Sequence, residues 1–148
     1  MHKTLWDEPS RRELIDRLAR LTPEAKRQWG KMNVSQMLAH VAGALRMARG
    51  ELHVASRNLP IRYPPLKQLV IFWLPFPRGA PTAPELIGID IDDWDSGIAD
   101  VRTQIEHFAT RDRNADWPIH PAFGKMTPRA WGVLGYRHID HHFKQFGI

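Results

Sequence analysis

Histidine is the residue type best suited to chemistry in this 148-residue chain, which contains no cysteine. The eight histidines are His2, His40, His53, His107, His120, His138, His141 and His142. His138 and His142 stand four residues apart in a segment with helical periodicity, so both rings would project from one helix face and could bind a divalent metal together. The absence of cysteine excludes thiolate ligands, cysteine nucleophiles and disulfides. Imidazole coordination is therefore the chemistry to consider first.

The two faces of the last predicted helix, residues 128–146, differ sharply in composition. At about 100° per residue, one side carries Arg129, Arg137, Asp140 and Lys144, and the opposite side carries Trp131, Leu134, His138, His142 and Gln145. The same projection of residues 34–49 places His40 on the inward side, together with Gln36, Ala44 and Met47. Two helices therefore aim three imidazoles, those of His40, His138 and His142, at one core.

A buried imidazole costs free energy unless its nitrogens have partners, and three such rings would repel one another if protonated. A shared metal ion would remove both problems. The alternative is that each ring bonds to a carbonyl oxygen or packs as a half-buried aromatic group. Three neutral imidazoles suit Zn²⁺ or Ni²⁺ and leave at least one coordination position open for water or a thiolate, as in catalytic sites.

Other residues could line or support such a site. Neither histidine-bearing helix has an Asp or Glu on its inward face, so a general base would come from a loop, where His120 is the candidate; the alternative for His120 is an exposed loop residue. Trp131 and Met47 could wall a pocket or belong to the core. His141 lies at the boundary between faces, either outside the site or supporting it. The candidates for lining a pocket or supporting the ligands are Gln36, Met47, His120, Trp131, His141 and Gln145.

The sequence predicts helices at about 10–21, 34–49, 66–74, 94–111 and 128–146, with a helical turn after Thr22 and Pro23. Asn33 with Gln36 is typical of a capping pair, and Thr127 with Pro128 supplies a second helix start. The run LVIFW could instead be a buried strand, but no partner strand is evident. We therefore expect one all-α domain, residues 1–148, forming a bundle with long proline-rich crossovers. The apolar stretch 70–76 would cap the bundle or form a dimer contact.

Charge is distributed unevenly along the chain. The net charge is +5, but residues 85–117 carry −6 and each flanking segment is positive. This pattern favours complementary helices over a stripe that follows phosphates, so nucleic-acid binding is disfavoured. The longest apolar stretch is far shorter than the roughly 20 residues of a membrane-spanning helix, and the first residues lack the apolar core of a signal peptide. We therefore expect a cytoplasmic protein with no membrane partner, and the open position of the three-histidine site favours a small-molecule substrate.

Two segments resemble the signature helices of the DinB-like (YfiT-like) superfamily of metalloenzymes. They are MNVSQMLAHV at 32–41 and YRHIDHHFKQFG at 136–147. The HxxxHxxQ pattern of His138, His142 and Gln145 is the closest match. Segments 5–32, 62–86 and 117–134 look like a bacterial branch of that superfamily with no assigned function. The resemblance covers essentially the whole chain.

The resemblance implies a four-helix bundle with an unusual crossover, usually dimeric, and a nickel or zinc site. Carried over residue by residue, its ligands are His40, His138 and His142, and this sequence keeps all three. Some relatives transfer or isomerise small substrates with low-molecular-weight thiols such as bacillithiol, mycothiol or glutathione. The expected function is thus a metal-dependent transferase or hydrolase. The competing hypothesis is a non-enzymatic dimeric bundle that binds a metal or ligand.

Overall fold

Side chains that accept backbone N–H groups mark where the long helices begin. The computed structural model describes all 148 residues, and the four long helices are α1 (Glu8–Leu18), α2 (Val34–Ala48), α4 (Trp94–Phe108) and α5 (Pro128–Gln145). Their N-caps are Asp7, Asn33, Asp93 and Thr127, and each accepts an N–H of the first turn. The predicted Asn33–Gln36 capping box is confirmed. Such caps satisfy N–H groups that have no partner within the helix.

The remaining elements lie in the crossover between α2 and α4. They are the 3₁₀ turns η1 (Pro60–Arg62) and η2 (Pro84–Leu86) and the short helix α3 (Leu66–Phe72). The structure has no strands, only an isolated bridge between His120 and Gly124, so the predicted all-α class is confirmed and the strand alternative for LVIFW is wrong. None of the helices is both long and apolar enough to cross a bilayer.

Several predicted helix limits are wrong, and among them α1 ends at Leu18 instead of about 21 and α3 ends at Phe72 instead of 74. α1 begins at Glu8 because the Asp7 carboxylate, ahead of Ser10, accepts the Ser10 N–H. The residues after Thr22 form only a turn, and the chain then runs without regular structure to α2. α4 ends at Phe108 instead of Arg111, whose guanidinium donates to the Arg49 carbonyl beside the end of α2. Capping side chains and contacts with neighbouring segments therefore determine where these helices begin and end, and helical periodicity does not predict those positions.

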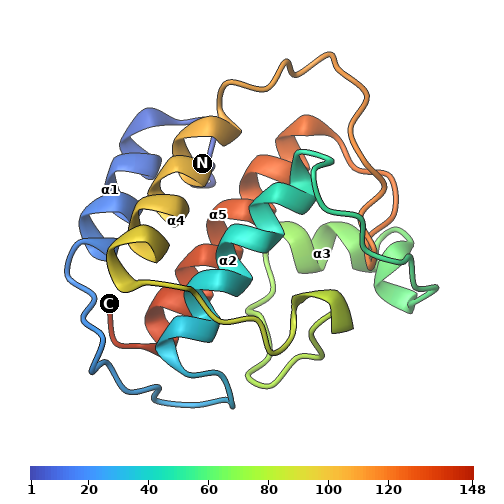
Figure 1. Cartoon of the computed structure of the whole chain (residues 1–148). Coiled ribbons are helices and arrows are strands. Elements are labelled where there is room, and N and C mark those ends of the chain that lie inside the picture. The colour runs from blue at the N-terminus through green and yellow to red at the C-terminus, as the bar shows by residue number, and fades with distance from the viewer.

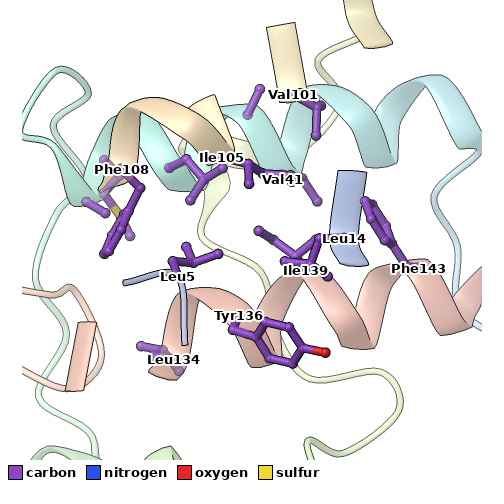
Figure 2. Close-up of a cluster of buried hydrophobic side chains, with 14 of the residues drawn as sticks. Leu5, Leu14, Val41, Val101, Ile105, Phe108, Leu134, Tyr136, Ile139 and Phe143 are labelled. Carbon is purple, nitrogen blue, oxygen red and sulfur yellow. The ribbon is translucent and has the colours of Figure 1, made fainter. Parts of the chain in front are cut away.

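The four long helices pack pairwise in a closed sequence: α1 contacts α4 and α5, and α2 contacts the same two helices (Figure 1). α2 and α5 run in opposite directions across their contact. The core between the four helices is made of fully buried aliphatic and aromatic side chains (Figure 2). Members from each helix are Leu14, Val41, Val101, Ile105, Phe108, Ile139 and Phe143. This packing fixes the spacing of α2 and α5.

The apolar stretch 70–76 includes the end of α3, which lies against α5. α3 packs against α5, and its Ile71 is fully buried. Arg137 of α5 donates to the carbonyl oxygens at the end of α3, including that of Val70 at 2.7 Å, so this cation is used to hold the short helix. Trp73 remains 70% exposed. The structure shows this packing against α5, while the cap on a bundle and the dimer contact both stay predictions.

Candidate metal centre

The three predicted ligand histidines meet where α2 crosses α5. Nε2 of His138 lies 3.0 Å from Nε2 of His40 and 3.2 Å from Nε2 of His142. One nitrogen from each of the three rings lies within 4.8 Å of the others, and no Asp or Glu belongs to the group. Four-residue spacing puts His138 and His142 on one face of α5, and the antiparallel α2 presents His40 to them. The sequence prediction of this cluster matches the geometry.

Burial keeps the cluster uncharged. His40 is 5% exposed and His142 8% exposed, and His138 has an intermediate exposure. Burial lowers the pKa of His40 to about 4, and burial together with the neighbouring His40 lowers the pKa of His142 to about 3. The pKa of His138 is also lowered, first by burial and then by the other two rings. All three imidazoles are therefore neutral at pH 7, the form that binds metals.

Gln145 orients His142. The Oε1 atom of Gln145 lies 3.0 Å from Nδ1 of His142, while its Nε2 donates to the Trp29 carbonyl oxygen at 2.8 Å. Because the amide N–H group is directed at Trp29, the carbonyl oxygen faces His142, and Nδ1 of that ring carries the proton. Its Nε2 is then a free lone pair directed at His138. Metal-binding histidines commonly have this kind of partner on the second nitrogen.

Hydrogen atoms alone do not satisfy the cluster. With the proton of His142 on Nδ1, its Nε2 can only accept, and Nε2 of His138 has at most one proton to give. That proton can go to His142 or to His40, so both short N···N contacts cannot be normal hydrogen bonds from His138 at once. Nδ1 of His40 is buried without a hydrogen-bond partner of good geometry. An ion that accepts three lone pairs would resolve the conflict.

The spacing of the nitrogens also fits a metal. In a tetrahedral zinc site with Zn–N bonds of about 2.0–2.1 Å, the ligand nitrogens lie about 3.3 Å apart. The observed separations from His138 are 3.0 and 3.2 Å. Three imidazoles fill three tetrahedral positions, which leaves the fourth for a water or a substrate atom. The donor set and these two separations therefore fit Zn²⁺, and imidazole suits Ni²⁺ as well.

His120 lies in a tight loop and outside the cluster. Its Nδ1 accepts the backbone N–H groups of Ala122 and Phe123, both at 3.1 Å, and its ring packs on Trp131. Burial, with Arg62 and Lys67 nearby, lowers its pKa to about 3. The exposed-loop alternative is wrong, since the ring is partly buried. One nitrogen is occupied by the loop, so only Nε2 is free for another partner.

The other candidates divide between core, cap and site. The Gln36 side chain accepts the Asn33 N–H, so it serves the start of α2. Met47 and Trp131 belong to the buried core, which was the alternative to a pocket wall. His141 lies beside the cluster, with its ring 5.3 Å from that of His142 and the rings of Trp29 and Phe76 each 5.9 Å away. It supplies no atom to the three-histidine group.

Sequence reasoning missed the loop contact that supports Gln145. Trp29 and Gly30 lie in the irregular segment before α2, and the Trp29 carbonyl holds the Gln145 amide. Sequence reasoning also missed Leu86 of η2, which packs beside Gly43. The backbone of Leu86 raises the pKa of His40 and so offsets part of the lowering that burial causes. These contacts join residues far apart in the chain through backbone atoms. Gly30 has φ of 84°, a left-handed conformation that glycine adopts readily. No sequence pattern indicates that Gly30 lies against Gln145.

Residues 75–147 match the model of a family described as a protein of unknown function (DUF1569). The matched range contains α4 and α5, with His138 and His142, and begins after α2, which carries His40. No curated protein and no solved structure matches the chain. The similarity to this family therefore brings no activity or ligand with it.

Proposed function

We propose that this protein is a divalent-metal-dependent enzyme of the DinB-like type, a four-helix bundle with nickel or zinc held by His40, His138 and His142. Its reaction is transfer or hydrolysis of a small molecule, with a low-molecular-weight thiol as the co-substrate in the transfer case. The observation that carries the proposal is the convergence of three neutral Nε2 atoms that hydrogen atoms alone cannot satisfy.

Bound at this site, the metal would act as a Lewis acid on a water, thiol or substrate oxygen in its open position. The chain's own residues prepare that position. Gln145 keeps the proton of His142 on Nδ1, and burial keeps the rings of His40 and His142 neutral. Of the three ligand residues, His138 alone is not fully buried, so we expect a small molecule to approach from its side.

The second candidate is a non-enzymatic bundle in which the ion serves stability. One observation favours it: the cluster contains no carboxylate, and the loop histidine His120 has Nδ1 committed to backbone N–H groups. A built-in general base is therefore absent from the three-histidine group itself. A metal-activated thiolate needs no such base, because the ion itself favours the deprotonated form. Turnover assays separate the two candidates.

The deciding experiment is elemental analysis of tag-free protein after incubation with Ni²⁺ or Zn²⁺ and removal of free ions. We expect about one equivalent in the wild type and a large loss in His40→Ala and in His142→Ala. His53→Ala, at an exposed position away from the cluster, is the matched control and should keep the metal. A wild-type protein that retains no ion would overturn the metal centre. Metal-loaded protein inactive with thiols and electrophiles would favour the second candidate.

The proposal includes a homodimer. Its support is exposed apolar surface on α3 and directly after it, where Leu69, Trp73 and Leu74 are 43%, 70% and 42% exposed. Exposed apolar clusters of this kind often mark protein contacts. Light scattering coupled to size exclusion should give twice the 17.1 kDa chain mass, and Trp73→Ala should shift it toward the monomer. A monomeric wild type would contradict this part of the proposal.

A further inference from the structure

The loop between α1 and α2, residues 19–33, contacts Gln145 at two points. The Gln28 N–H donates to the backbone carbonyl of Gln145 at 2.7 Å, and the Gln145 side chain donates to the Trp29 carbonyl at 2.8 Å. Gln145 is 4% exposed, so water does not compete freely for its amide. The loop therefore holds both the backbone and the side chain of the residue that contacts His142.

Gly30, which has no side chain, leaves room for the amide group of Gln145. A Cβ atom at Gly30 would lie 2.2 Å from Nε2 of Gln145, far inside van der Waals contact. The atom in the way is the end of a flexible side chain, so an alanine there would displace the amide instead of the backbone. Gly30 also has φ of 84°, a conformation that residues with a side chain rarely adopt.

We infer that the α1–α2 loop positions a side chain of the candidate metal centre. The Trp29 carbonyl and the absence of a Cβ atom at Gly30 fix the orientation of the Gln145 amide. That orientation determines which nitrogen of His142 carries the proton and which is left as a lone pair toward His138. An amide held with its N–H toward Trp29 must present its oxygen to His142, so the proton stays on Nδ1. A displaced or rotated amide loses that preference. Nε2 would then carry the proton in part of the molecules and would be blocked as a ligand.

This inference rests on the proposed function only where metal affinity is measured, because the proton position on His142 is a property of the metal-free protein. The first test is the imidazole ¹⁵N spectrum of chelator-treated protein at neutral pH. We expect His142 in the wild type with a protonated Nδ1 and a bare Nε2. A wild-type ring protonated mainly on Nε2 would overturn the inference without any variant.

The second test compares Gly30→Ala with Gly50→Ala. Gly50 has φ of 79°, and a Cβ atom there would meet nothing within 4 Å, so this control carries the same backbone strain without touching a side chain. We expect Gly30→Ala to shift His142 toward the other tautomer and to weaken Co²⁺ or Zn²⁺ binding about tenfold or more, the range typical for loss of a partner behind a ligand. Gly50→Ala should change neither. Equal behaviour of the two variants would overturn the inference.

A rescue variant separates positioning from general damage. In Gly30→Ala/Gln145→Glu, both terminal oxygens of the ionised side chain accept hydrogen bonds, so the carboxylate presents no donor to His142 in any orientation. We expect the proton to return to Nδ1 despite the alanine. Failure of the double variant to restore the tautomer, with the fold intact by circular dichroism, counts against the inference. If no variant or wild type binds metal but the tautomers behave as stated, the positioning stands and the proposed function fails.

Discussion

His40 and His138 are 98 residues apart in the sequence, yet their Nε2 atoms lie 3.0 Å apart at the contact of α2 with α5. Only the packed structure brings these nitrogens together, because the α5 pair alone has two of the three rings. Metal affinity and global stability are therefore coupled. A ligand that binds only the folded state stabilises it according to its concentration relative to its Kd.

Metal loading should raise the melting temperature. At free metal about 100 times the Kd, the added free energy of unfolding is about 2.7 kcal/mol, which for a chain of this size corresponds to about 5–10 °C in Tm. A chelator should reverse the increase. His40→Ala should show no metal-dependent shift in calorimetry, and a shift of the same size in that variant would argue against His40 as a ligand.

The metal-free protein should lose stability as the pH falls below 6.5. The pKa of His40 is about 4 in the folded state, against 6.5 for the ordinary side chain, so the unfolded chain binds a proton between those values that the folded chain does not. His40 alone should lower the free energy of unfolding by about 2 kcal/mol between pH 7.5 and 5.0. Urea denaturation at both pH values measures this.

His40→Gln tests the source of that pH dependence, because glutamine does not titrate. The variant should lose less stability on acidification than the wild type does. His53→Gln, the same substitution at an exposed position, is the control. If His40→Gln and the wild type have the same slope, burial of His40 is not what makes the folded state sensitive to acid.

Arg17 should matter far more for stability than Arg12, another α1 arginine in an ion pair. Arg17 donates to Asp140 at 2.8 Å and to the Ile148 carbonyl at 2.9 Å, and its side chain is 10% exposed. Arg17→Met leaves Asp140 without its buried partner, so we expect a loss of about 2 kcal/mol in urea denaturation. Arg12→Met removes the pair of Arg12 with Glu8, whose side chains are 70% and 67% exposed, and should cost under about 0.5 kcal/mol.

Arg137→Ala should loosen α3 without unfolding the bundle. Removal of the guanidinium leaves the carbonyl groups of Val70, Ile71 and Leu74 without this donor. We expect amide hydrogen exchange in residues 66–74 to accelerate at least about tenfold, with little change in α2 or α4. Arg129→Ala, whose guanidinium packs over the Phe72 ring, is the control. Unchanged exchange in α3 would show that packing alone holds the helix.

The sequence predicts those features that depend on residues close together in the chain. Helix starts at Asn33 and Thr127 follow from a side chain that reaches a backbone N–H three residues on, and the inward register of His138 and His142 follows from helical periodicity. His40 could be included because a second helix shows the same periodicity. This local information is enough to assemble the candidate ligand set.

Contacts between distant segments account for what the sequence did not predict. Arg137 and Asp140 belong to the polar side of α5 in a helical projection, but α3 covers the first and Arg17 of α1 pairs with the second. The contact of Trp29 with Gln145 uses a backbone carbonyl, which leaves no trace in residue types. A projection of one helix distinguishes polar from apolar faces, and it cannot show which polar groups another segment will bury.

The segment before α1 is packed against α5. Leu5 is fully buried, and its N–H donates to the Gly132 carbonyl at 3.0 Å. The Trp6 indole donates to the Pro128 carbonyl, 122 residues along the chain, and Gly132 leaves room for that indole. During synthesis on the ribosome, the hydrogen bonds of this segment to Pro128 and Gly132 can therefore form only after the start of α5 has emerged. The part of the core that α5 contributes can close only after residues 128–145 have been translated.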